Sequence, residues 1–581
     1  MPSGSFHASA ARIIQVKNNY AVIRKGLHKA LIYTDEPAPF DAEIGLSAEG
    51  ENIRETYGFY RYPFSRKMRA EGITLAYGRE SWRIKKEHFS FRRIVQKRID
   101  SISDTGQRAL LYRFLLGITV SDAPEDTLLF AEGFSVTCLL SFFSCILKYM
   151  CRKEQRHRIL LCANIFLAFF LHFPMILTYS LISRICAQMH LSKTEKTAVP
   201  VILILFLFPS AIMTPSFLII LIYRLSRYSY ENDSKNAFFL QMHVQSIFMH
   251  YADPFYTLLF PFLRILAGAA CFTAWIDLFF PFLHMTAWTV VLNRMMEILS
   301  VFRIRGSCLG SGTVFYLLML VSVRKYKNKQ ILRILLFLVF LRCGLFHPFP
   351  SVTFINVGQG DAVCINSGLH RDTVLIDTGK PSQQNNLQSF LDAVSVNRLS
   401  LFVITHADSD HSGNAEFVRR HYRPITEVTE HEQVIHLKTL TLHDLNEISN
   451  SDENQSSIVL FTKINHLSYL FMADADEESE RAVIRKYDAL KCDVLKLSHH
   501  GSKTGSCERF LDAVRPGIGI ISSGSYSIYH HPSSEVIQRL LKRHIPYFDT
   551  KEEGDIAILS IWKWNFLITS KGTISLLDPS G

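Results

Sequence analysis

Cysteine is sparse in this chain, and so is any pattern that would give it a structural role. The sequence of 581 residues has 11 cysteines, none before Cys138, and no C-x-x-C pair. This distribution argues against a disulfide framework and against a zinc site built from thiolates. Residues 1–20, MPSGSFHASAARIIQVKNNY, lack the apolar core of a secretory signal peptide. We therefore expect neither a disulfide-stapled domain nor a cleaved leader.

Charge and hydrophobicity point to several domains and to lipid. The net charge is +11, hydrophobic residues make up 48% of the chain, and 43 residues are Phe. The positive charge allows an anionic partner or anionic lipid headgroups. The Phe residues concentrate between about 127 and 350, where lipid is the expected solvent. The length exceeds that of a single hydrophobic core, so we expect a multidomain protein.

Residues 1–100 form the first predicted domain. The runs RIIQV, YAVIRK, KALIY and GITLAYG alternate apolar and polar residues across 10–85, which is typical of short, half-exposed strands. We predict a compact β-barrel there; an irregular basic leader is the alternative. Residues 81–100, SWRIKKEHFSFRRIVQKRID, predict a basic amphipathic helix with a solvated or membrane-surface face.

Residues 101–348 form the second predicted domain, a polytopic α-helical membrane domain of six to eight helices. Several of its apolar segments reach about 20 residues, the length that crosses a bilayer. The alternative is a long buried helical bundle in a soluble protein. The segments are 127–148, 159–183, 199–223, 254–280, 308–323 and 330–346, with 237–250 and 275–292 as doubtful additions.

Short basic links between these segments predict their orientation. They span 148–158, 224–235 and 324–329, and basic links favour the cytoplasmic side. The chain would then be a multi-pass protein of the cell membrane. Six spans would place both its N-terminal and its C-terminal domain outside the cell. Polar residues inside the spans are costly in lipid and are expected to face a bundle interior, a pathway or the interface. They are Glu132, Arg184, Arg264 and Asp277.

Residues 349–581 form the third predicted domain, of α/β class. Strand-like runs such as SVTFINVGQGDAVCINSG and DTVLIDTG end in Gly and Asp turns, and 387–396 and 476–489 predict helices. Within it, VITHADSDHSGN (403–414) places His406, Asp408, Asp410 and His411 directly after an apolar run. Imidazole and carboxylate are ligands for borderline divalent ions, so the cluster predicts a metal site with room for two ions. A surface charge patch is the alternative.

Other predicted strands end in residues of the same kind, which strengthens the metal hypothesis. VLIDTG, YLFMADAD, VLKLSHHGS and IYHHP each place a carboxylate or an imidazole after an apolar run. The residues are Asp377, Asp474, His499, His500, His530 and His531.

These motifs resemble the metallo-β-lactamase fold, a layered αββα domain whose H-x-H-x-D-H signature here has Asp408 in the second His position. FINVGQGDA, VLIDTG, THADSDHSGN, LFMADADEESE, LKLSHHGSKTGS and YHHP resemble, more closely, the ComEC-type competence family. That resemblance implies an oligonucleotide-binding (OB)-like barrel, a polytopic membrane domain and a hydrolase domain. Two positions depart from the family pattern: Asn356 replaces an Asp, and Ala473 replaces a Gly.

The resemblance also implies roles for the site residues. Two divalent ions, Mn²⁺ or Zn²⁺, are expected to be bridged by Asp474, and the hard ligand Asp408 favours Mn²⁺. His406 and Asp408 would hold one ion, Asp410 and His411 the other, and His499 and His500 would complete the set. Asp377 and Asp361 would orient ligands. Asp410, Lys503 and His531 are the candidate catalytic groups: Lys503 for phosphate charge, unless it is simply solvated, and His531 as proton donor. His530 is expected on a surface loop.

Two functions stay open from the sequence. One is a membrane protein that imports single-stranded DNA and carries an extracellular metal-dependent nuclease domain. The other is a membrane-tethered hydrolase that acts on another phosphoester or ester and transports nothing. The resemblance names single-stranded DNA and membrane lipid as partners, and it allows other competence proteins and a homo-oligomer.

Overall fold

The computed structural model describes residues 11–118 with short gaps, 134–208 apart from 172–173, 251–280, and 351–577 apart from 447–453 and 525–530. Isolated residues between these stretches are also described. The chain forms two compact units. The first comprises Met1–Glu55, Pro63–Phe248 and Ala252–Ile304, and the second comprises Thr56–Tyr62, Met249–Tyr251 and Arg305–Gly581.

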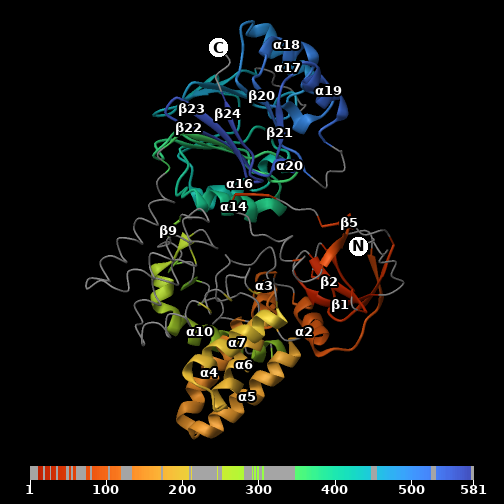
Figure 1. Ribbon diagram of the computed structural model, residues 1–581, viewed down its shortest axis with the longest axis vertical. Helices are drawn as coiled ribbons and strands as arrows, with labels where there is room; N and C mark the ends of the chain where they lie inside the picture. The colour runs from red at the N-terminus through yellow and green to blue at the C-terminus, as the bar shows by residue number, and fades with distance from the viewer. Residues whose placement is uncertain are drawn as a thin grey trace, which may run out of the picture. The chain divides into compact units, whose positions relative to one another are not determined.

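A seven-stranded sheet forms the N-terminal part of the first unit (Figure 1). Its order is β5-β6-β3-β2-β1-β4-β7, with an antiparallel meander β1-β2-β3 and a parallel β3–β6 pair. The prediction of short strands across 10–85 is confirmed. The strands are β1 (Ala11–Val16), β2 (Tyr20–Lys25), β3 (His28–Tyr33), β4 (Glu43–Leu46), β5 (Glu51–Asn52), β6 (Ile73–Tyr77) and β7 (Trp82–Lys86).

The prediction of one helix over 81–100 is wrong in its first half. Residues Trp82–Lys86 are strand β7, which pairs antiparallel with β4, and the helix α2 is Phe91–Asp100. Ser90 caps the helix by accepting a hydrogen bond from the Arg93 amide, which fixes its start. The basic face is not fully solvated, because Arg92 is buried and ion-paired with Asp41.

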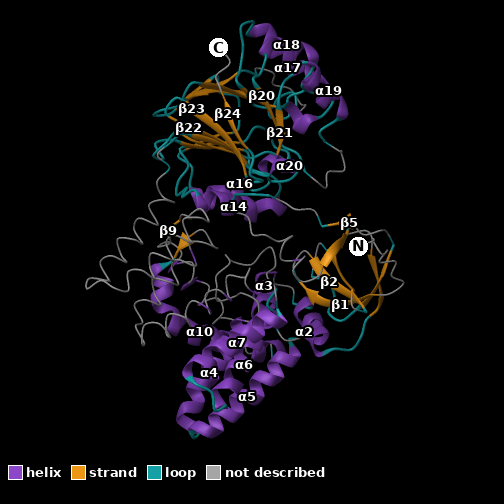
Figure 2. Cartoon of the chain, viewed as in Figure 1, coloured by secondary structure: helices purple, strands orange, loops and turns teal. Residues whose placement is uncertain are grey.

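Helices make up most of the rest of the described first unit (Figure 2). One described helix, α10, is long and apolar enough to cross a membrane by length and composition. Gly268 lets α10 approach α4 closely, since a Cβ there would lie 2.3 Å from the Cys138 carbonyl oxygen. The helices are α3 (Thr105–Leu111), η2 (Tyr112–Leu116), α4 (Phe134–Met150), α5 (Lys153–Phe170), α6 (Met175–Gln188), α7 (Lys193–Leu207) and α10 (Pro254–Phe279).

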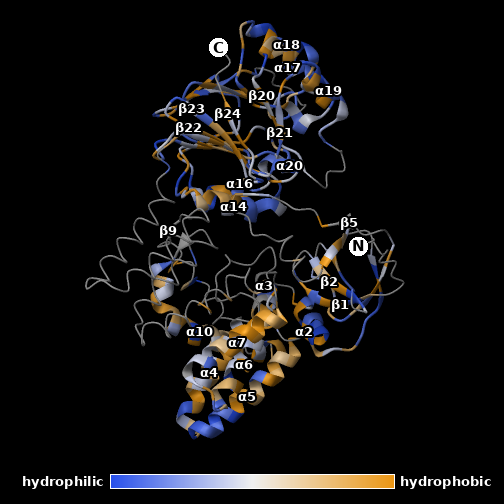
Figure 3. Cartoon of the chain, viewed as in Figure 1, coloured by the Kyte–Doolittle hydropathy of each residue, from blue (hydrophilic) through white to orange (hydrophobic). Residues whose placement is uncertain are grey.

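The helix boundaries differ from the predicted spans. The apolar segment 159–183 is divided between α5 and α6, with Pro174 at the N-cap of α6, where a proline disfavours a continuous helix. The helices α5, α7 and α10 expose Phe166, Phe169, Phe206 and Leu258, and Figure 3 shows their apolar character. The predicted segments 308–323 and 330–346 lie outside the described residues, as do most of 237–250 and 281–292.

Two sheets form the second unit. The first has the order β14-β13-β12-β11-β10-β22-β23-β24 and the second β15-β16-β17-β18-β19-β20-β21. The first contains β10 (Ser351–Phe354), β11 (Val363–Asn366), β12 (Thr373–Ile376), β13 (Leu401–Val403), β14 (Thr426–Val428), β22 (Ile556–Ile561), β23 (Trp564–Thr569) and β24 (Ile574–Leu577). The second contains β15 (Val434–His436), β16 (Thr441–Asp444), β17 (Leu460–Ile464), β18 (Leu467–Phe471), β19 (Val494–Lys496), β20 (Ile518–Ile521) and β21 (Tyr547–Asp549).

The sheets face each other, and helices cover their outer faces. Phe354 of β10 and Phe471 of β18 meet in the core between the sheets, with ring centroids 6.0 Å apart. On the outer side of the first sheet, α14 (Gln384–Ala393) and α16 (Ala415–Tyr422) share one apolar cluster. On the second sheet, α17 (Glu477–Lys486), α18 (Glu508–Val514) and α19 (Ser534–Lys542) share another. The predicted αββα arrangement and the predicted helices near 387–396 and 476–489 are confirmed.

Strand direction determines the edge of the sheets at which the polar side chains gather. Strands β12, β13 and β14 run parallel, as do β18, β19, β20 and β21, so their carboxyl ends meet along shared edges. The inner strands β12, β13, β19 and β20 are buried on both faces, which explains continuous apolar runs such as Leu401–Val403. Short elements follow some of them: η7 (Pro381–Gln383), α15 (Ser409–Ser412), η8 (Ser498–Gly501) and α20 (Thr550–Glu553).

Candidate metal centre

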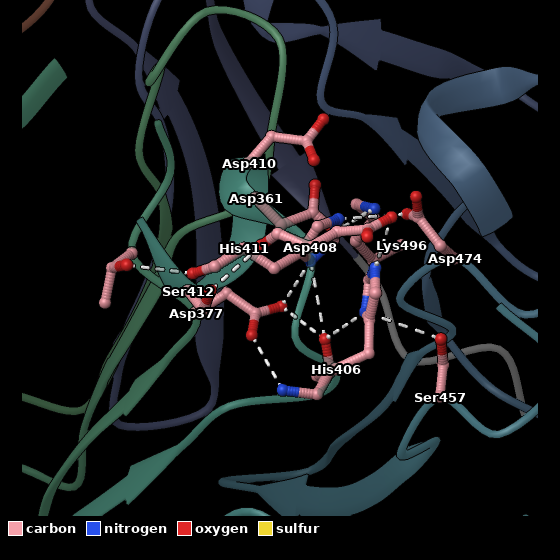
Figure 4. A network of polar contacts seen from close by, with 12 residues as sticks. Asp361, Asp377, His406, Asp408, Asp410, His411, Ser412, Ser457, Asp474 and Lys496 are labelled. Carbon is pink, nitrogen blue, oxygen red and sulfur yellow. Dashed lines mark hydrogen bonds and ion pairs between the residues drawn. The ribbon is translucent and has the colours of Figure 1, made fainter. Parts of the chain in front are cut away.

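Five chain segments bring the predicted ligands together beyond the strand ends (Figure 4). Asp377 follows β12, His406 follows β13, and α15 carries Asp410 and His411. From the second sheet, Asp474 follows β18, and His499 and His500 follow β19 within η8. The ligand atoms of Asp361, His411, Asp474 and His500, all buried, lie within 4.8 Å of one another. The predicted convergence of separate strand ends is therefore observed.

Asp474 lies at the middle of the cluster and faces imidazoles with both oxygens. Its Oδ1 is 3.2 Å from His411 Nε2 and 3.5 Å from His500 Nε2. Its Oδ2 is 3.6 Å from His499 Nε2. The ring centroids of His406 and His411 lie 4.0 Å apart. One carboxylate thus faces two groups of ligand-type side chains.

The first group, which we call the inner half-site, consists of Asp410, His411 and His500. The Nε2 atom of His500 is 3.7 Å from Asp410 Oδ2. Both imidazoles are backed by a carboxylate at the other ring nitrogen: His411 Nδ1 lies 2.8 Å from Asp377 Oδ2, and His500 Nδ1 lies 3.3 Å from Asp361 Oδ1.

The second group, the outer half-site, consists of His406, Asp408 and His499. His406 Nε2 lies 3.6 Å from Asp408 Oδ2, and the Asp408 side chain is 51% exposed. Hydroxyls, not carboxylates, stand behind its imidazoles. The Oγ1 of Thr405 is 3.1 Å from His406 Nδ1, and the Oγ1 of Thr504 is 3.3 Å from His499 Nδ1.

A buried lysine supports one of the backing carboxylates, and the sequence analysis missed it. Lys496, the last residue of β19, is 1% exposed and forms an ion pair with Asp361. It stands in the apolar run VLKL, and a cation inside a buried strand is the signal that could have identified it. The residue before Asp361 is Gly360, and a side chain would not fit there, because a Cβ would lie 2.3 Å from the Asp410 carbonyl oxygen.

The backing carboxylate Asp377 also fixes the loop that follows β13. It accepts hydrogen bonds from the Thr405 amide and from the Thr405 hydroxyl, each 2.8 Å long. Asp377 itself has a positive φ of 58°, an uncommon backbone conformation for a residue with a side chain. Its position between Thr405 and His411 therefore ties two chain segments of the site together.

Buried charge shifts the protonation of the inner residues. Burial opposes charge on His411, but the carboxylates of Asp474 and Asp377 outweigh it and raise its pKa well above the ordinary value. For His500, burial is likewise outweighed by Asp474 and Asp361, and its pKa rises to about 9. Burial would raise the pKa of Asp474, yet His500 and His411 lower it well below its usual range.

The outer imidazoles shift in the opposite direction. Burial lowers the pKa of His406, and the neighbouring His411 adds to the effect. Burial also lowers the pKa of His499. These imidazoles are thus favoured in the neutral form, which is the form that binds metal.

The residues fit a divalent cation. Buried polar atoms that form no hydrogen bond to the described residues include His406 Nε2, His411 Nε2, His500 Nε2 and Asp474 Oδ1. Leaving such atoms buried and unpaired is costly, and all four lie at the cluster. A cation between the imidazoles and carboxylates would satisfy them together.

The remaining predicted residues lie at the edge of the cluster or outside it. Lys503 is exposed on the loop after η8. The His531 ring centroid is 6.0 Å from that of His499. Burial lowers the pKa of His531 to about 4, with His500 and His499 adding to the shift. His530 lies outside the described residues.

A comparison with protein families agrees with this fold. A family model of the metallo-beta-lactamase superfamily matches residues 355–450. A metallo hydrolase from Ignicoccus hospitalis aligns over 36% of this chain and 98% of its own, with 14% identity and a TM-score of 0.27. The sheet order and the family model carry the assignment: the C-terminal domain has the metallo-β-lactamase fold and a candidate divalent-metal site.

Three curated relatives are competence or recombination proteins. ComE operon protein 3 of Bacillus subtilis is 28% identical over 42% of this chain and 38% of its own length. Recombination protein 2 of Haemophilus influenzae is 27% identical over 39% and 31%. Competence protein ComA of Neisseria gonorrhoeae is 30% identical over 33% and 30%. The predicted resemblance to the ComEC-type competence family is confirmed, and the chain matches less than two fifths of each relative's length.

Proposed function

We propose that this chain is a membrane DNA-uptake protein that imports single-stranded DNA and whose C-terminal domain is a metal-dependent nuclease. The observation that carries the proposal is the set of buried imidazole and carboxylate atoms around Asp474 that form no hydrogen bonds with the described residues. They lie in a metallo-β-lactamase fold within a chain related to competence proteins.

We assign the inner half-site and Asp474 Oδ1 to one ion, and the outer half-site and Asp474 Oδ2 to a second. When bound, two such ions, Mn²⁺ or Zn²⁺, would lower the pKa of water and neutralise charge on a phosphodiester. Asp377 and Asp361 hold the Nδ1 atoms of His411 and His500, so that each Nε2 faces the site. Lys496 neutralises Asp361.

Lys503, His531 and Asp410 are the proposed catalytic groups. Lys503, exposed on the loop that follows His499 and His500, is assigned to the phosphate charge. His531, beside His499, is assigned to protonating the leaving oxygen; because its pKa is lowered, its protonated form is a minor species at neutral pH and a correspondingly strong acid. Asp410 would help to hold one ion, which would supply the activated water. Two of these side chains lie beside residues of the half-sites: His531 lies beside His499, and Asp410 lies beside His500.

The first unit is assigned to DNA and membrane contact. The meander β1-β2-β3 with its parallel β3–β6 pair supports an OB-like single-strand binder, in which stacking and phosphate contacts give little sequence preference. The exposed apolar side chains of α5, α7 and α10 support a polytopic membrane domain of six to eight helices. Single-stranded DNA and lipid are the proposed partners; other competence proteins and a second copy of the chain are further ones.

A substrate comparison tests the nuclease. The full-length chain in detergent, loaded with Mn²⁺, should cleave single-stranded DNA with weak sequence preference, and its DNA binding should weaken steeply with salt. Asp410→Ala is expected to stop cleavage. Cleavage of a generic phosphodiester or lactone but never of DNA would favour the membrane-tethered hydrolase instead.

A labelling experiment tests the location. We assign the chain to the cell membrane with both end domains outside. Ser3→Cys and Ser580→Cys should therefore each react with an impermeant thiol reagent on intact cells, beyond the parental background. Reaction at one end alone would mean an odd number of spans.

A further inference from the structure

One buried carboxylate, that of Glu480, accepts hydrogen bonds from both ends of the loop that carries His499 and His500. Glu480 of α17 accepts hydrogen bonds from the Ser498 hydroxyl at 2.5 Å, the Ser506 amide at 2.5 Å and the Cys507 amide at 2.9 Å. Ser498 begins the loop, and Ser506 and Cys507 end it. Glu480 is fully buried, so both ends of the loop are held by one side chain.

The loop has a backbone that needs such support. His499 and His500 have φ values of 47° and 53°, and Ser506 has a φ of 51°. Left-handed conformations are unfavourable for residues with a side chain, because the Cβ comes too close to the following carbonyl oxygen. They persist only where the surroundings determine them. The ends also pack tightly, because a Cβ on Gly505 would lie 2.6 Å from that of Ser498.

A carboxylate at this buried position destabilises the fold unless its interactions offset the cost of burying its charge. Its hydrogen-bond donors among the described residues are the Ser498 hydroxyl, two amides and the Cys507 thiol, all uncharged. Burying a carboxylate without a cation is unfavourable, and burial accordingly raises the pKa of Glu480. An apolar residue would fill the core without burying a charge but would leave these donors unpaired.

We propose that Glu480 is a positioning residue of the metal centre: by closing the 498–507 loop, it holds the left-handed His499–His500 pair against Asp474. This inference rests on the proposed metal function. The two imidazoles serve different half-sites, since His499 faces Asp474 Oδ2 and His500 faces Oδ1. Loosening the loop should therefore weaken both metal positions.

The variant Glu480→Gln tests this with little change in shape. Its Oε1 can keep the bonds from Ser498 and Ser506, whereas its amide NH₂ would face the Cys507 N–H, donor against donor. Full-length Glu480→Gln should bind Mn²⁺ about 10–100-fold more weakly in calorimetry, the range seen when groups behind metal ligands are changed. In the metal-free chain, hydrogen exchange at the Ser506 and Cys507 amides should speed up.

Two further variants complete the test. Ser498→Ala removes one donor and should have a smaller effect in the same direction, which covers the case that Glu480→Gln fails to fold. The control is Glu477→Gln, on the exposed first turn of the same helix, where Glu477 pairs with Arg481. It should change neither affinity nor exchange.

The failures are distinguishable. A wild-type chain that binds Mn²⁺, together with Glu480→Gln and Ser498→Ala variants of wild-type affinity, would overturn the inference alone. A wild-type chain that binds neither Mn²⁺ nor Zn²⁺ would overturn the proposed metal function and the inference with it.

Discussion

The inner and outer half-sites share Asp474 but differ in what stands behind their imidazoles. His411 and His500 are buried and backed by Asp377 and Asp361, whereas hydroxyls back His406 and His499. A carboxylate behind an imidazole raises its basicity and fixes its orientation more firmly than a hydroxyl does. The difference teaches that two positions with similar ligand types need not bind equally, and we expect the inner half-site to bind its ion more tightly.

The most damaging change should remove the shared residue. Asp474→Ala takes a ligand from both half-sites, so the rise in melting temperature on adding Mn²⁺ should vanish and DNA cleavage should fall below detection. Binding of single-stranded DNA should persist, because this carboxylate serves the ions and not the phosphates. Calorimetry and a gel-shift assay measure the two effects. Asp488→Ala, at an exposed turn, is the control. Two bound ions in Asp474→Ala would show that the half-sites do not depend on it.

The next largest effect should come from the support of the inner half-site. Asp377→Asn weakens the partner of His411 Nδ1 and removes charge from the bonds to Thr405. We expect an affinity loss of about 10–100-fold at the tighter of two Mn²⁺ binding steps. Asp377 is a cleaner choice than Asp361, whose neutralisation would leave the buried Lys496 unpaired. A loss confined to the weaker step would reverse our assignment of the half-sites.

The support of the outer half-site should matter less. Thr504→Val keeps the side-chain shape and removes the hydroxyl 3.3 Å from His499 Nδ1. A neutral hydrogen bond contributes about 1 kcal/mol, which corresponds to a change of roughly fivefold in the weaker Mn²⁺ binding step. A loss of Mn²⁺ affinity as large as that of Asp377→Asn would contradict the expectation that a carboxylate supports an imidazole more strongly than a hydroxyl does.

The smallest effect concerns a residue next to the shared ligand. Ala473 replaces the glycine of the family pattern and has a φ of 46°. Ala473→Gly relieves left-handed strain of about 1 kcal/mol or more, and the added flexibility of the unfolded chain offsets part of it. We expect a net gain of about 0.5 kcal/mol and a rise of one to two degrees in melting temperature. Ala475→Gly, where φ is not positive, should lower it instead.

How well the site residues could be predicted depended on how far apart in the sequence the contacting residues lie. His406, Asp408, Asp410 and His411 lie within one short loop, so their grouping could be inferred from spacing alone. The strand-end residues Asp377 and Asp474 could be inferred because each follows an apolar run, as the cluster at 406–411 does. The prediction for 81–100 failed because a basic segment of mixed pattern reads as a helix, while pairing with β4 makes its first half a strand.

The sequence by itself determined the ligand chemistry, the αββα layering and the likeness to competence proteins, because side-chain type and hydrophobic period are local properties. Only the tertiary structure decided which ring nitrogen faces the site and which partner stands behind it. Lys496 and Asp361 are separated by 135 positions, and Glu480 lies 26 positions from Ser506. Such pairs form because a buried charge is unfavourable unless a partner lies beside it in the folded chain. The hydrophobic period of a sequence does not indicate which distant residues come into contact.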